Sequence, residues 1–117
     1  MKMEMNRIMK TAEVTNWLRI KAWLHRKNVG SFYWAVNMLL NGSICTSSGW
    51  WCKSEVFIGL ITRKTDGKKF IGITKEVYIH DFFVGYEMCP LDDVELRVFP
   101  TMNNWIVSKT DGKNLIK

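Results

Sequence analysis

The sequence predicts an α+β domain with two N-terminal helices packed on an antiparallel sheet of about five or six strands. Up to residue 40 the apolar residues recur at helical spacing, three and four positions apart. After Gly42 the apolar pattern changes to the two-residue period of strands, and an Asp-Gly pair marks a hairpin turn. Helices followed by consecutive short strands are typical of the α+β class. A length of 117 residues suffices for one domain with a single core.

The first helix is expected over residues 11–28. Val14, Trp17 and Leu18 have the i, i+3, i+4 spacing of an apolar helical face. Gly30 ends the segment, because glycine adopts the left-handed conformation of a helix C-terminus without a steric penalty. The segment therefore predicts an amphipathic helix near the start of the chain.

The positive charge of the chain is concentrated before residue 31. Residues 1–30 carry seven Lys or Arg side chains against Glu4 and Glu13, while the whole chain has a net charge of +6. We interpret residues 1–30 as a basic N-terminal extension that contains the first helix, and residues 31–117 as the main domain. A basic segment can attract nucleic acid or another anionic partner, but a solvated helix face gives the same pattern.

The second helix is expected over residues 32–40. Ser31 precedes it, and its hydroxyl can accept a hydrogen bond from a free backbone N–H of the first turn. Asn41 and Gly42 are the stop signal. One face of this helix is apolar, and its residues are Phe32, Ala35, Val36, Leu39 and Leu40.

Three strands are expected around the Asp-Gly pair. A short strand covers residues 43–46, and a second, rich in β-branched residues, covers residues 56–62. Asp66 and Gly67 can both take positive φ, so they predict the turn of a hairpin. The return strand is expected over residues 70–74.

The C-terminal third is expected to contribute three more strands. Side chains that alternate between two faces predict strands at 76–84 and 94–99, and Pro100 ends the second of these strands. The last strand is expected at 104–108. Residues 85–93 contain a proline and are interpreted as a loop whose acidic side chains are solvated.

Composition argues against several classes of protein. No apolar run reaches the roughly 20 residues needed to cross a bilayer, and the first ten residues lack the apolar stretch of a secretory signal. Cys45, Cys52 and Cys89 are odd in number and have no paired spacing, which is typical of a reducing compartment. We therefore expect a cytoplasmic protein with no membrane partner.

The sequence shows no motif of a catalytic site. It contains no GxSxG, P-loop, HExxH or CxxC pattern. His80 and Asp81 are adjacent in an expected strand, so their side chains point to opposite faces and do not form a dyad. The Cys and His residues also lack the spacing of four zinc ligands. We expect a protein that is not an enzyme and holds no metal or cofactor.

Flat aromatic side chains next to basic and amide groups indicate binding instead. Trp50 and Trp51 follow Gly49, and two adjacent indoles in an extended chain cannot both point into one core. Aromatic rings can stack on bases, while Lys53 and Asn104 could meet a phosphate and a base or ribose edge. The alternative is that most tryptophans are core or subunit contacts.

Part of this pattern resembles the phage Thoeris anti-defence 2 family. The shared motif is F-x-x-A followed by two hydrophobic positions, a glycine, a short strand and then G-W-x-x-K. The matching residues are Phe32, Ala35, Val36, Leu39, Gly42, Gly49, Trp50 and Lys53. Asn104, Trp105 and the two residues after them give a looser C-terminal match. Members of that family are small homo-oligomers that bind cyclic-nucleotide immune signals without cleaving them.

The resemblance implies a phage-type sponge that sequesters a cyclic nucleotide or cyclic ADP-ribose-like messenger and so blocks bacterial anti-phage signalling. On this hypothesis residues 31–117 form the ligand-binding domain, in which Trp50 and Trp105 stack the base and Lys53 meets phosphate. The full set of expected ligand-binding residues is Phe32, Trp50, Trp51, Lys53, Asn104 and Trp105. The alternative hypothesis is a small basic phage inhibitor that binds nucleic acid or a host defence complex through the N-terminal helix.

Overall fold

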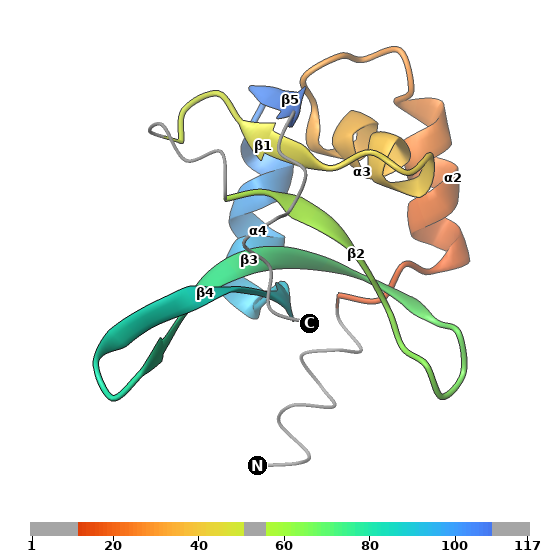
Figure 1. Cartoon of the computed structure of the whole chain (residues 1–117). Helices are drawn as coiled ribbons and strands as arrows, with labels where there is room; N and C mark the ends of the chain where they lie inside the picture. Colours follow the sequence, from red (N-terminus) through yellow and green to blue (C-terminus); the bar gives the residue numbers. More distant parts are fainter. Residues whose placement is uncertain (1–11, 51–55, 109–117) are drawn as a thin grey trace.

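The computed structural model of the chain describes residues 12–50 and 56–108. Its five strands form one antiparallel sheet in the order β4-β3-β2-β1-β5 (Figure 1). Two helices precede the sheet, which confirms the α+β class. In chain order the elements are α2 (Asn16–Leu24), α3 (Phe32–Leu40), β1 (Cys45–Ser47), β2 (Ile58–Thr62), β3 (Lys69–Ile79), β4 (Phe82–Pro90), α4 (Asp93–Val98), the 3-10 helix η1 (Phe99–Thr101) and β5 (Trp105–Val107).

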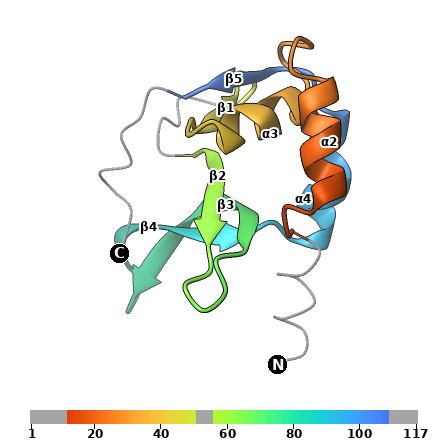
Figure 2. The same cartoon turned by 90° about the vertical axis from the view of Figure 1, so that its right-hand side faces the viewer.

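The core lies between α3 and the sheet. α3 packs against β1, β2 and β5, and α2 packs on α3. Figure 2 shows α2 and α4 on the same side of the sheet. Ala12, Val14 and Ala22 belong to the same buried cluster as α3, so residues 12–30 pack with the main domain. Among the described residues, no helix has the length and apolar character needed to span a membrane.

The second helix has the predicted bounds. The Ser31 hydroxyl accepts a hydrogen bond from the backbone N–H of Trp34 at 3.2 Å, as expected for an N-cap. Asn41 is the C-cap, and Gly42 follows with a φ of 95°. The apolar face faces the core, because Phe32, Ala35, Val36 and Leu39 are all buried.

The first helix is shorter than predicted. It starts at Asn16, where the Thr15 hydroxyl accepts from the backbone N–H of Leu18 at 3.2 Å. The preceding residues instead extend along β3: the N–H of Val14 donates to Lys69 at 2.8 Å, and Ala12 accepts from β3 at 2.9 Å. Extended pairing with the sheet satisfies these backbone groups, so the predicted start at residue 11 is wrong. Only Ala22 of α2 is fully buried.

The hairpin predicted at Asp66 and Gly67 is confirmed. β2 and β3 are antiparallel, and Thr62 pairs with Lys69 across the loop. Gly67 has a φ of 72°, and Asp66 accepts from the backbone N–H of Lys68 at 3.1 Å. The strands expected at 56–62 and 104–108 are present with shorter bounds, as β2 and β5, and the strand expected at 43–46 is present as β1, shifted to residues 45–47.

The predicted strand at 76–84 and loop at 85–93 are wrong. A tight turn at His80 and Asp81, with φ of 50° and 68°, divides this region into the ends of β3 and β4. Ile79 pairs with Phe82 directly across the turn. Two successive positive φ angles are typical of the type I′ turn of a two-residue β-hairpin, whose twist matches that of the flanking strands. Neither His80 nor Asp81 is Gly or Asn, the residues most common in this turn.

The predicted strand at 94–99 is also wrong. The structure has the helix α4 and then η1 in its place. Asp92, expected in a solvated loop, is instead the N-cap of α4 and forms a capping box with Glu95. The reciprocal hydrogen bonds satisfy two free N–H groups at the helix start, which overrides the alternating apolar pattern.

Candidate ligand-binding site

Three of the residues expected to bind ligand meet in one aromatic cluster. The ring centroid of Trp105 lies 5.3 Å from that of Trp50, 5.3 Å from that of Phe99 and 5.8 Å from that of Phe32. The Trp50 and Phe99 rings meet Trp105 edge to face, a preferred arrangement of aromatic pairs. The Nε1–H of Trp105 donates to the Phe99 carbonyl oxygen at 3.4 Å. The cluster therefore satisfies the polar group of the indole internally.

This cluster belongs to the core rather than to an open site. Trp105 is 1% exposed and Phe32 is 3% exposed. A base needs an accessible ring face, so the burial of Trp105 argues against its stacking on a ligand, which stays a prediction. Trp50 is partly buried against the same cluster. The alternative weighed from the sequence, that a tryptophan serves the core, holds for Trp105.

The other expected residues lie beside the cluster or outside the described part of the chain. Asn104 is exposed, and its carbonyl oxygen accepts from the backbone N–H of Ser48 at 2.9 Å. This bond ties the start of β5 to the turn that follows β1. Trp51 and Lys53 lie outside the described residues, so their expected roles stay predictions.

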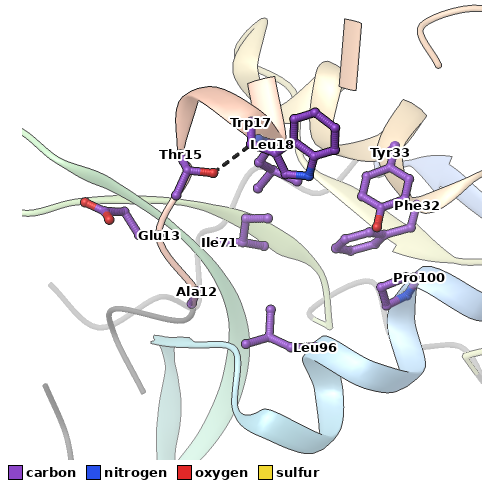
Figure 3. Close-up of a pocket in the computed structure, with 10 residues that line it drawn as sticks. All are labelled: Ala12, Glu13, Thr15, Trp17, Leu18, Phe32, Tyr33, Ile71, Leu96 and Pro100. Atoms are coloured by element: carbon purple, nitrogen blue, oxygen red, sulfur yellow. Dashed lines mark hydrogen bonds between the residues drawn. The ribbon is translucent and has the colours of Figure 1, made fainter. Parts of the chain in front are cut away.

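A separate pocket opens between α2, α3, β3 and α4, with a volume of about 220 Å³ (Figure 3). Phe32 belongs both to this pocket and to the aromatic cluster, so the core aromatic residues support one side of it. The lining residues are Ala12, Glu13, Thr15, Trp17, Leu18, Phe32, Tyr33, Ile71, Leu96 and Pro100.

Two aromatic rings line one side of the pocket, and a cation lies next to both rings. Figure 3 shows the side chains of Trp17 and Tyr33 on the same side of the cavity. The Lys21 Nζ lies 5.9 Å from the Trp17 ring centroid and 4.7 Å from that of Tyr33, within cation–π range of both. It also donates to the Tyr33 hydroxyl at 3.4 Å. Because Trp17 is 66% exposed, its ring is accessible to a ligand from solvent.

The rest of the pocket is apolar with a polar edge. Ile71 and Leu96 supply its aliphatic surface. At the edge, the Thr15 hydroxyl accepts from a backbone N–H and keeps its own proton for a ligand. The Glu13 carboxylate pairs with Lys68 across 3.4 Å, so its negative charge has a partner. The site can therefore hold a flat ring with a negatively charged substituent near Lys21.

Sequence reasoning missed this pocket. Its lining comes from five separate parts of the chain, which only the tertiary fold brings together. Trp17 matched the apolar spacing of a core-facing helix, and nothing in that spacing shows that the ring is exposed. The one local signal was the i, i+4 spacing of Trp17 and Lys21, which places their side chains together on a helix.

The two described cysteines have raised thiol pKa values, and the described acids do not gather as a metal site. Cys45 is fully buried, and burial raises the pKa of its thiol to about 12, so it is protonated at neutral pH. The pKa of Cys89 is also raised, by burial first and then by its hydrogen bond to Glu87. Within residues 12–50 and 56–108, no three His, Cys, Asp or Glu side chains gather as a metal site.

Comparison of the chain with protein-family models, with curated proteins and with solved structures gave no match.

Proposed function

We propose that this protein binds and sequesters a small anionic molecule with a planar ring system, of the cyclic-nucleotide class, without converting it. The observation that supports this function best is a pocket lined by Trp17 and Tyr33, with the Lys21 ammonium group within cation–π range of both rings. Stacking on an aromatic side chain contributes about 1–3 kcal/mol per base. The Lys21 ammonium is a mobile point charge that suits a phosphate oxygen.

The size of the pocket limits what enters it. Its volume of about 220 Å³ is below the roughly 300–1,000 Å³ of sites that enclose drug-sized ligands. One base-sized ring therefore fits inside, and the sugar and phosphate of the ligand remain at the rim. The Lys21 ammonium lies 5.9 Å and 4.7 Å from the ring centroids of Trp17 and Tyr33, which both line the pocket.

The resemblance to the phage Thoeris anti-defence 2 family supports the messenger class. In this proposal the protein acts in the cytoplasm of the host cell and withdraws a cyclic nucleotide or cyclic ADP-ribose-like signal from a defence effector. Phe32, which the resemblance assigns to the binding site, lines the pocket. Trp50 does not line the pocket, and its ring contacts Trp105, which in turn contacts Phe32, so in this proposal it supports Phe32 rather than the ligand.

One observation favours a second function, binding of nucleic acid through α2. Trp23 is 56% exposed, and the Arg26 guanidinium stacks 3.7 Å from its ring centroid. An exposed aromatic ring next to cations is typical of single-strand binding surfaces. Such binding weakens steeply between low and physiological salt, whereas a ring held in a pocket depends less on salt.

A thermal-shift screen tests the proposed function. The purified protein is mixed with cyclic dinucleotides, cyclic trinucleotides, cyclic ADP-ribose isomers, a short single-stranded DNA or a short DNA duplex. A ligand present at 100 times its Kd stabilises the folded state by about 2.7 kcal/mol, which gives a clear increase in Tm. The bound ligand is then released by denaturation, and its mass is measured to show that it is intact.

Two tryptophan variants locate the site. Trp17→Ala removes an aromatic wall of the pocket and should abolish the ligand-induced shift. Trp23→Ala is the matched control, because Trp23 is as exposed on the same helix but does not line the pocket. Loss of binding in the control alone, or recovery of a cleaved ligand, would contradict the proposed function. A shift with DNA alone would favour the second one.

A further inference from the structure

The end of the β3–β4 hairpin is an apolar surface without a partner in the described structure. β2 pairs with β3 only as far as Ile73, so the distal part of the hairpin is a ribbon of two strands. Five side chains there are 45–74% exposed: Tyr78, Ile79, Phe82, Phe83 and Val84. We call these residues the hairpin surface. A two-stranded ribbon is marginally stable in water, so contact with another surface would stabilise it.

The hairpin surface is apolar on both faces of the ribbon. Tyr78 pairs with Phe83 on one face, with ring centroids 5.8 Å apart, and Ile79 pairs with Phe82 on the other. An ordinary ribbon that covers a core on one face exposes polar residues on the other. Apolar residues on both faces of an extended ribbon instead suit insertion against a second apolar surface.

A second apolar surface lies on α2 and the turn that follows it. Ile20, Trp23 and Leu24 have the i, i+3, i+4 spacing of one helical face, and they are 52–63% exposed. Val29 lies in the turn that follows α2 and is 74% exposed. We call these four residues the helix surface. Exposed apolar residues gathered on one helix face mark a contact site more often than scattered ones do.

The charges around the two surfaces are opposite. Residues 16–29 carry the cations Arg19, Lys21, Arg26 and Lys27 and no acidic side chain. Residues 76–87 carry the acids Glu76, Asp81 and Glu87 and no Lys or Arg. Charge complementarity of this kind steers association and disfavours contacts between like surfaces.

We propose that the hairpin surface of one copy of this protein docks on the helix surface of a second copy. The turn between β3 and β4 and the helix α2 lie on opposite sides of the molecule in both views (Figures 1 and 2), so one chain cannot bring its own pair of surfaces together. A contact between two different surfaces is head-to-tail, and its repetition gives a closed ring or an open chain of copies. The proposal does not depend on the proposed ligand, because none of the residues in either surface lines the pocket.

Two complementary variants test this contact. The hairpin variant Ile79→Thr/Phe82→Thr keeps the helix surface, and the helix variant Ile20→Gln/Trp23→Gln/Leu24→Gln keeps the hairpin surface. The molar mass of each is measured by light scattering after size exclusion over a series of protein concentrations. We expect an oligomer for the unmodified chain, a monomer for each variant alone, and a 1:1 dimer when the two variants are mixed.

The control variant is Val94→Gln/Val98→Gln, which removes exposed apolar side chains of α4 outside both surfaces and should leave the oligomer unchanged. A charge variant, Arg26→Glu/Lys27→Glu, retains the apolar residues and should also be monomeric. This charge variant replaces the helix variant in the test if circular dichroism shows that the helix variant is not folded. A monomeric unmodified chain, a helix variant that still dimerises alone, or a mixture that stays monomeric would each overturn the proposal.

Discussion

Asp92 and Glu95 cap the first turn of α4 reciprocally. The Asp92 Oδ1 accepts from the backbone N–H of Glu95 at 2.8 Å, and the Glu95 Oε1 accepts from the backbone N–H of Asp92 at 2.9 Å. Both carboxylates also lie within 3.7 Å of the Lys75 ammonium, which joins α4 to β3. This pair therefore fixes both the start of the helix and its position beside the sheet.

Replacement of Asp92 by alanine should lower the free energy of unfolding by about 1 kcal/mol, because loss of the cap leaves the backbone N–H of Glu95 without its acceptor. Urea denaturation at high salt measures the effect of the cap, since salt screens the exposed ion pair with Lys75. Asp93→Ala is the control, because Asp93 lies in the same turn without being the cap, and a few tenths of a kcal/mol are expected from the helix dipole alone. Equal losses in the two variants would show that the capping box does not stabilise the helix.

The sequence predicted the elements whose local signals agree with their packing. In α3 the Ser31 cap, the apolar spacing and the Gly42 stop all mark the same bounds, and the helix has those bounds. In α4 two local signals conflict, because VELRVF alternates like a strand while Asp92 and Glu95 form a capping box. Six residues are too few for periodicity to separate a helix from a strand.

Other features depend on the tertiary structure alone. The His80–Asp81 turn has no Gly or Asn, so only the pairing of β3 with β4 reveals it. Trp17 and Trp105 are both large apolar residues in an apolar pattern, yet one is 66% exposed and the other 1%. Because Trp17 is exposed and Trp105 is buried, the candidate ligand-binding site contains Trp17 and not Trp105. It is therefore visible only once the helices are placed on the sheet.

Gly30 is expected to tolerate no side chain. Its φ is 97°, and an added Cβ would lie 2.7 Å from the backbone oxygen of Asn103. Its own carbonyl oxygen accepts from the N–H of Trp105 at 2.9 Å, so the two segments cannot separate without loss of this bond. Gly42→Ala is the control, with a φ of 95° and nothing within 4 Å of its Cβ.

Gly42→Ala should cost about 1–2 kcal/mol, the ordinary penalty of the left-handed conformation. Gly30→Ala should cost clearly more, because the clash adds to the same penalty. Both losses are measured by urea denaturation, with the same slope m of unfolding free energy against urea concentration used for the two variants. Similar losses would mean that the Gly30–Asn103 approach relaxes easily.

The ion pair of Arg63 and Asp66 should make stability depend on acid pH. The Arg63 side chain, by its hydrogen bonds, and the Lys68 N–H lower the pKa of Asp66 from 3.8 to about 2. A pKa that is lower in the folded state stabilises that state above about pH 4 and loses this effect as the pH falls toward the folded pKa. Asp66→Asn should therefore flatten the plot of Tm against pH between about 4 and 2.

Arg63→Gln tests the assigned cause. It removes the largest contribution to the lowered pKa but leaves the backbone hydrogen bond from Lys68, so its plot should lie between those of the unmodified chain and Asp66→Asn. An unchanged plot for Asp66→Asn would show that the pair does not form in solution.

Cys45 should resist alkylation in the folded protein. Its Sγ is fully buried 3.8 Å from the Ala35 carbonyl oxygen, and its pKa of about 12 leaves almost no thiolate at pH 8. Iodoacetamide treatment followed by peptide mass mapping should find no label on Cys45 in the native protein and full label in urea. Cys89, which is only partly buried, is the internal comparison and should be labelled first. Rapid native labelling of Cys45 would contradict its burial.

Alanine variants of Trp105 and Trp50 should show whether the aromatic cluster contributes to the stability of the fold or to ligand binding. Trp105→Ala should lower the free energy of unfolding by about 3–5 kcal/mol, since it leaves a large cavity among Phe32, Phe99 and Trp50. Trp50 is only partly buried, so Trp50→Ala should cost about 1–2 kcal/mol and should retain the ligand that stabilises the unmodified chain. Denaturation and the thermal-shift assay give both quantities for each variant. A Trp105→Ala protein of near-normal stability that no longer binds ligand would favour the aromatic cluster over the pocket as the ligand site.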